Sequence, residues 1–98
     1  MVVWTVPAKQ DLKRIFDYIE RDSRYYAEEV VSKVVDLSIG LDSLPDQGRI
    51  VPEINEPYIR EVFVYSYRLI YQTKLDQVYV LAVIHMGRHL NDKMISPV

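Results

Sequence analysis

The residues best suited to acid–base or anion-binding chemistry gather in the second half of the 98-residue chain. This half holds both histidines, His85 and His89, and imidazole is the side chain that titrates near neutral pH. The chain has no cysteine, which excludes thiol catalysis, disulfides and thiolate-bound metals. The same half holds four arginines, whose planar guanidinium groups bind phosphates and carboxylates: Arg49, Arg60, Arg68 and Arg88.

Strand alternation predicts that Arg68 and His85 lie on the same face of a sheet. Each lies in a β-prone run, in which successive side chains point to opposite faces. Within Val78–His85 the small aliphatic side chains alternate with the set that contains His85, and we expect the aliphatic set to pack against helices. Arg68 must also avoid the helix-covered face, because an unpaired buried guanidinium is very costly. We therefore expect Arg68 and His85 to converge on the uncovered face.

Each candidate also has a purely structural interpretation. Arg68 could pair with Glu61 across a β-hairpin, where opposite charges commonly face each other. His85 could be an ordinary strand-end histidine that is hydrogen-bonded to the backbone. Glu53 lies in a proline-bracketed loop and is expected to be solvated, whereas Arg60 could tie this loop to the sheet.

Hydrophobic periodicity predicts the elements that position these residues. A short first strand stops at Pro7, and an amphipathic helix is predicted over residues 7–21. Ser23 is the predicted N-cap of a second helix that runs to about Leu44, so that the two helices form a hairpin. Three strands follow, at Tyr58–Val64, Tyr67–Thr73 and Val78–His85.

The predicted order β-α-α-β-β-β indicates an α+β fold, with a two-helix hairpin packed on a mostly antiparallel sheet. The length predicts a single domain over residues 1–98. The tail, residues 89–98, has no periodicity and is expected to be loosely ordered. Val35, Ile39 and Met94–Ile95 are left without an internal partner, so we expect them to contact a partner protein.

Composition and charge disfavour several classes of function. No apolar run approaches the ~20 residues of a membrane span, and the first residues lack the basic start of a signal peptide. We therefore expect a cytoplasmic protein without membrane association. The net charge of −2 disfavours a protein that grips nucleic acid by its phosphates. The sequence suggests no cofactor and no metal site.

Five short motifs follow one another in a characteristic order over about residues 1–90. They are Ala8…Asp11-Leu12…Ile15…Tyr18-Ile19, Gly48-Arg49…Val51-Pro52-Glu53, Ile59-Arg60-Glu61, Tyr67-Arg68-Leu69-Ile70-Tyr71 and Val83-Ile84-His85-Met86-Gly87-Arg88. Together they resemble the RelE/ParE superfamily, the toxins of bacterial type II toxin–antitoxin systems. The resemblance implies the same fold, a two-helix hairpin on an antiparallel sheet.

The resemblance implies one of two mechanisms. RelE-like toxins cleave messenger RNA in the ribosomal A site, whereas ParE-like toxins bind and poison DNA gyrase without chemistry of their own. Both kinds are held inactive by a small cognate antitoxin, whose C-terminal segment wraps the toxin. Oligomers in such systems can form through the antitoxin.

For the cleaving branch, the resemblance also implies roles for individual residues. Arg68 matches the arginine that clamps the scissile phosphate, and Glu53 resembles the general base of the YoeB-like branch. His85 or His89 would be the general acid. The remaining candidates for binding phosphate or target are Arg60 and Arg88.

Three features favour the gyrase-binding branch by a small margin. Glu61 would repel phosphate from a strand that is lysine-rich in RelE enzymes. The C-terminal tyrosine of cleaving members has no counterpart, because Tyr79 is the last tyrosine. The net charge of −2 gives no steering toward an RNA-lined cleft. The sequence therefore predicts a ParE-like toxin, with a RelE/YoeB-like messenger RNA endoribonuclease or an inactive antitoxin-binding relic as alternatives.

Overall fold

Two helices form an antiparallel hairpin near the N-terminus, and side-chain caps define where each begins. The computed structural model describes residues 1–98 and places helix α1 at Val6–Glu20 and helix α2 at Arg24–Gly40. Thr5 caps α1 by accepting a hydrogen bond from the Ala8 amide at 3.3 Å. Ser23 caps α2 by accepting from the Tyr26 amide at 3.1 Å, which confirms the predicted cap. The second helix ends at Gly40, four residues before the predicted end.

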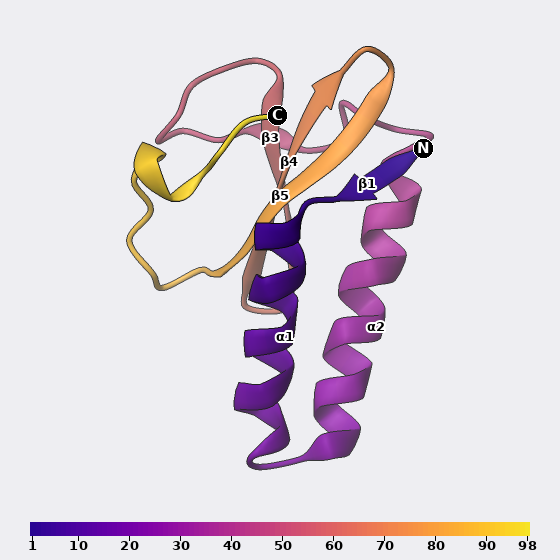
Figure 1. The fold of residues 1–98 in the computed structure, drawn as a ribbon, viewed down its shortest axis with the longest axis vertical. Helices are drawn as coiled ribbons and strands as arrows, with labels where there is room; N and C mark the ends of the chain where they lie inside the picture. Colours follow the sequence, from indigo (N-terminus) through magenta and orange to yellow (C-terminus); the bar gives the residue numbers. More distant parts are fainter.

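A five-stranded sheet packs against this hairpin, and its strand order is β1-β5-β4-β3-β2 (Figure 1). Strand β1 pairs parallel to β5, and all other neighbours are antiparallel. The arrangement confirms the predicted α+β fold, and only the two-residue strand β2 was not anticipated. The strands are β1 (Val2–Trp4), β2 (Arg49–Ile50), β3 (Ile59–Val64), β4 (Tyr67–Lys74) and β5 (Gln77–His85).

The face of the sheet that meets the helices carries the larger core. Here α1 and α2 pack against β3, β4 and β5, and the side chains are almost wholly buried. Asp11 of α1 accepts a hydrogen bond from the Val83 amide at 3.1 Å, which anchors the helix to the free edge of β5. None of the helices is both long and apolar enough to cross a membrane. The core includes Ala27, Val30, Val34, Leu69, Tyr71, Val80 and Val83.

The opposite face of the sheet is not open, because the loop before β3 and the C-terminal tail cover it. Leu90 and Ile95 of the tail are 3% and 5% exposed and pack on the aliphatic residues of this face. The Val98 amide donates to the Gln72 side chain at 2.7 Å, so the C-terminus lies against the sheet (Figure 1). The expectation of a loosely ordered tail is therefore corrected. The tail has an irregular backbone, so its apolar residues show no periodic pattern from which its packing could be predicted.

A β-bulge in β5 reverses the alternation on which the sequence prediction depended. Tyr71 pairs with Val80 and Ile70 pairs with Ala82, so Leu81 has no partner in β4. Beyond the bulge, Ala82 turns to the tail-covered face and His85 turns to the helix-covered side. The prediction that His85 lies on the face opposite the helices is wrong for this reason.

Candidate functional site

Arg68 is buried on the tail-covered face of the sheet and is held by two glutamates. Its side chain is 7% exposed, and Glu53 binds it from the loop before β3 through two hydrogen bonds of 2.8 Å. Glu61 of β3 accepts a third hydrogen bond, from Arg68 Nε to its Oε1 at 2.6 Å. A planar guanidinium that meets a carboxylate through two parallel bonds is among the strongest ion pairs in proteins. Glu53 is exposed, as expected, yet it is ion-paired with Arg68, and the alternative pairing of Arg68 with Glu61 is confirmed.

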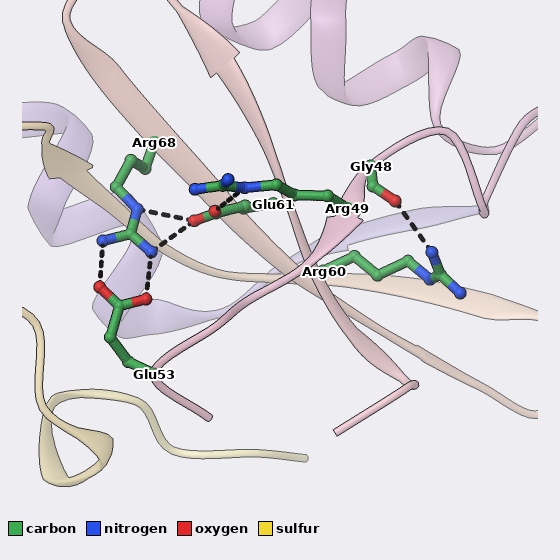
Figure 2. Close-up of polar contacts among 6 residues, drawn as sticks. All are labelled: Gly48, Arg49, Glu53, Arg60, Glu61 and Arg68. Atoms are coloured by element: carbon green, nitrogen blue, oxygen red, sulfur yellow. Dashed lines mark hydrogen bonds and ion pairs between the residues drawn. The ribbon is translucent and has the colours of Figure 1, made fainter. Parts of the chain in front are cut away.

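Arg49 completes a four-residue ion cluster that we call the charge cluster: Arg49, Glu53, Glu61 and Arg68 (Figure 2). Arg49 lies opposite Glu61 in the β2–β3 register and donates from Nε to Glu61 Oε2 at 2.6 Å. Its guanidinium also lies 5.1 Å from the Phe63 ring centroid. The Glu61 side chain is fully buried, so it needs both arginines to compensate for its lost hydration. Two positive and two negative charges cancel within the cluster.

The ion pair changes the pKa of both principal partners. The hydrogen bonds from Arg68, more than any other influence, lower the pKa of Glu53 from 4.5 to about 2. The hydrogen bond to Glu53 is also the largest cause that raises the pKa of Arg68 above its ordinary value. Glu53 therefore stays ionised, and cannot hold a proton, at any pH near neutrality. A general base that works near neutral pH needs a pKa closer to that pH.

Arg60 points away from the charge cluster and fastens the preceding loop to the sheet. It donates from Nη1 to the Gly48 carbonyl at 2.9 Å, as Figure 2 shows, and its Nε lies 3.7 Å from Asp46 Oδ1. Tyr71 joins the same loop by accepting from the Gly48 amide and donating to the Pro45 carbonyl. Burial raises the pKa of this tyrosine. The structural interpretation of Arg60 is therefore confirmed.

His85 lies on the other face of the sheet from Arg68. In the register of β4 and β5, His85 pairs with Tyr67 whereas Arg68 pairs with Ile84, so their side chains point in opposite directions. The ring of His85 stands edge-on to that of Tyr67, with centroids 5.6 Å apart. Its Nδ1 accepts from the Gly87 amide at 3.0 Å, which confirms the backbone-bonded alternative.

The predicted site residues thus fall into separate places. Glu53 and Arg68 are together, whereas Arg60, His85 and Arg88 each lie elsewhere. Arg88 is exposed and lines a small hollow at the free edge of β5, and His89 is exposed beside it. No three His, Asp or Glu side chains gather closely enough to ligate a metal ion.

Sequence reasoning missed the part played by Arg49 and by the full burial of Glu61. The sequence holds the two opposite charges in separate motifs, Arg49 after Gly48 and Glu61 after Arg60, and only the β2–β3 register brings them into contact. Strand β2 is two residues long, too short for a periodic pattern.

An apolar groove of about 560 Å³ is lined by residues of both helices and of β1. Its floor consists of Trp4, Leu12 and Phe16 together with two valines of α2, and Val35 is one of these. Lys9 and Lys13 line the same groove beside Asp17. Of the residues expected to contact a partner, Val35 therefore lines a groove and Ile39 is 62% exposed, whereas Ile95 is buried between the tail and the sheet.

Comparisons with known proteins agree with the fold and extend over most of the chain. The model of a family described as "ParE toxin of type II toxin-antitoxin system, parDE" matches residues 2–90. A solved structure, "Chromosomal ParDE TA system from P. aeruginosa", superposes with a TM-score of 0.73 at 21% identity. The match covers 88% of this chain and 95% of that chain. No curated protein sequence matches this chain.

Proposed function

Because the chain belongs to the ParE toxin family of type II toxin–antitoxin systems, we propose that it inhibits growth by binding DNA gyrase. The toxin acts on its target through a surface rather than through a reaction. It is neutralised by a cognate antitoxin, and it works in the cytoplasm, where gyrase and DNA are found.

The state of Arg68 is the observation that carries this proposal. An arginine that clamps a scissile phosphate must have donors free to meet the charge that develops in the transition state. Arg68 instead donates its hydrogen bonds to Glu53 and Glu61, within a cluster whose charges sum to zero. His85, which the resemblance offers as the general acid, points to the opposite face of the sheet. A proton donor and a phosphate clamp on opposite faces of one sheet cannot act on one phosphate.

The groove on the helix hairpin suits the antitoxin. An amphipathic antitoxin helix would place its apolar side on Leu12, Phe16 and Val35. Lys9 at the same groove favours an acidic partner segment, whereas Lys13 is paired with Asp17 at 3.0 Å. The binding of such a segment would raise the thermal midpoint of the toxin, since a ligand that binds only the folded state stabilises it.

The two mechanisms leave different traces in cells and with purified components. We expect that expression of the chain in bacteria induces a DNA-damage response and leaves messages uncut in ribosome profiling. We also expect the purified chain to bind gyrase and to inhibit its supercoiling activity. The variant His89→Gln, at the other candidate acid, should inhibit gyrase as the wild type does, because no proton transfer is involved.

Two other outcomes would contradict binding to gyrase as the mechanism. Message cleavage at the ribosomal A site that disappears in Arg68→Ala and in His85→Gln, with both variants folded, would establish the endoribonuclease mechanism. A chain that is harmless to cells but still binds the antitoxin encoded beside it would instead be an inactive relic.

A further inference from the structure

Aromatic side chains from α1, α2, β4, β5 and the turn between β3 and β4 lie on the helix side of the sheet, and all of them except the half-buried Tyr67 are exposed. We call this group the aromatic patch: Tyr18, Tyr26, Tyr65, Tyr67 and His85. Tyr18 of α1 is 67% exposed, and Tyr26 of α2 and Tyr65 of the turn are each 47% exposed. The hairpin of α1 and α2 extends past this end of the sheet (Figure 1).

The rings of the patch are arranged against one another rather than scattered. Tyr26 and Tyr65 meet edge to face with centroids 6.3 Å apart, and Tyr67 meets His85 in the same way at 5.6 Å. Tyr65 and Tyr67 flank Ser66 and belong to different pairs, so the turn joins the two pairs of rings. Burial raises the pKa of Tyr67, and the nearby Tyr18 and Tyr26 raise it further. The Met86 amide donates to the Ser66 carbonyl at 2.8 Å and so fixes the end of β5 against the turn.

Tyr65 is held in a backbone conformation that its side chain disfavours. Its φ is 51°, in the left-handed region, within the two-residue turn between Val64 and Tyr67. Turns of this kind strongly prefer Asn, Asp or Gly, because a bulky side chain is strained there. Strained residues occur often at binding sites, and the half-exposed ring of Tyr65 is accessible to a partner.

The helices beside the patch carry an excess of negative charge. Residues 17–29 contain five carboxylates and two arginines. One of these, Arg24, is already paired with Glu20 and Glu28. The other, Arg21, lies 6.0 Å from the Tyr18 ring centroid, so the patch already holds one cation over a ring. Such a surface repels phosphates and attracts cationic side chains, which interact favourably with aromatic faces.

We propose that the aromatic patch is the surface with which this toxin binds its protein target, at a site on the target that presents arginine or lysine side chains. Tyrosines grouped in this way supply most of the binding energy in many protein interfaces. The patch shares no residue with the groove assigned to the antitoxin, so target and antitoxin occupy different surfaces. This inference rests on the proposed function, and gyrase is therefore the target in its test.

The turn offers a variant that removes a ring without harming the fold. Tyr65→Gly deletes the side chain and places at φ 51° the one residue that adopts this value freely. Leu75→Gly is its matched control, because Leu75 also has a φ of 51° in a hairpin turn, is 88% exposed and lies at the other end of β4. Tyr18→Ser removes a second exposed ring, from a helix surface.

The measurement is the affinity of each purified chain for gyrase, alongside its thermal midpoint. We expect Tyr65→Gly and Tyr18→Ser to bind at least tenfold more weakly than the wild type and to lose toxicity. Leu75→Gly should bind and inhibit growth as the wild type does, and all three variants should remain folded.

Three other results would count against the inference, each in its own way. If both tyrosine variants bind gyrase with unchanged affinity, the patch is not the target surface, although the proposed function stands. If the wild-type chain does not bind gyrase, the proposed function fails and the inference fails with it. If the wild type binds a labelled single-stranded RNA and Tyr65→Gly abolishes this binding, the patch is a nucleobase-stacking surface and not a protein-binding one.

Discussion

At the scale of single residues, the most informative feature is Arg68, whose charge is neutralised by ion pairs within the protein. Arg68 neutralises Glu53 and shares Glu61 with Arg49, so that the two buried charges, Arg68 and Glu61, are balanced together with the more exposed Glu53 and Arg49. Removal of one partner from such a set leaves an uncompensated charge, which is far more harmful than the absence of the whole set. The chemistry of the cluster is therefore structural, and its titration should be visible in stability.

The ion pair of Glu53 predicts how the stability of the fold depends on pH. The pKa of Glu53 falls from 4.5 in the unfolded chain to about 2 in the folded protein. Its contribution is therefore complete above about pH 5 and is lost as the pH falls toward 2. We expect the stability gap between the wild type and Glu53→Gln to be largest near neutral pH and to close in acid, as measured by urea unfolding at several pH values.

Glu56→Gln is the control for this titration, because Glu56 is an exposed glutamate of the same loop without an ion pair. The free energy of unfolding of Glu56→Gln should differ little from that of the wild type at every pH. A gap for Glu53→Gln that is constant between pH 7 and pH 3 would show that the pair with Arg68 does not form in solution.

At the scale of elements, the loop that carries Glu53 is set in place by close backbone contact. Gly48 begins this segment, and its amide and carbonyl are held by Tyr71 and Arg60. A Cβ atom at Gly48 would lie 2.5 Å from the Glu61 carbonyl oxygen and 2.8 Å from the Tyr71 hydroxyl. The absence of a side chain is what allows β2 to approach β3 closely enough for Arg49 to reach Glu61.

Gly48→Ala should therefore destabilise the protein by about 1–3 kcal/mol, the usual cost of overpacking a closely packed site. Gly40→Ala is the matched control, because a Cβ atom there meets nothing within 4 Å. That change should be neutral or stabilise the fold by up to about 1 kcal/mol, since alanine restricts the unfolded chain. Chemical denaturation of both variants tests the contrast, and equal midpoints would contradict the close approach.

At the scale of the whole molecule, one sheet is buried on both faces although the chain has only two α-helices. The helix hairpin covers one face, and the tail and the loop before β3 cover the other. A second apolar layer is valuable in a chain of 98 residues, because a small domain buries a low fraction of its surface. The same layer closes off the face on which Arg68 lies.

The tail should therefore contribute measurably to stability. Ile95 is 5% exposed within the second core, and Ile95→Ala should cost about 3 kcal/mol, which is typical of the truncation of a buried isoleucine. Lys93→Ala, two residues earlier and exposed, should change stability by less than about 0.5 kcal/mol. Thermal unfolding distinguishes the two, and an unaffected Ile95→Ala variant would mean that the tail is not packed on the sheet.

Local patterns in the sequence determined the elements of this protein and its fold class. The apolar spacing of the helices, the Ser23 cap and the β-prone runs of β3, β4 and β5 are properties of neighbouring residues, so they can be read without any tertiary contact. They placed both helices, four of the five strands and the α+β arrangement.

Only the tertiary structure decided which residues meet across the sheet. The unpaired Leu81 reverses the alternation of β5 and so separates His85 from Arg68, yet a bulge leaves no mark in a periodic pattern. The register of β2 on β3 brings Arg49 to Glu61, and the packing of the tail depends on an apolar face that exists only once the strands are paired. Cross-strand contacts join residues far apart in sequence, and local periodicity therefore cannot specify them.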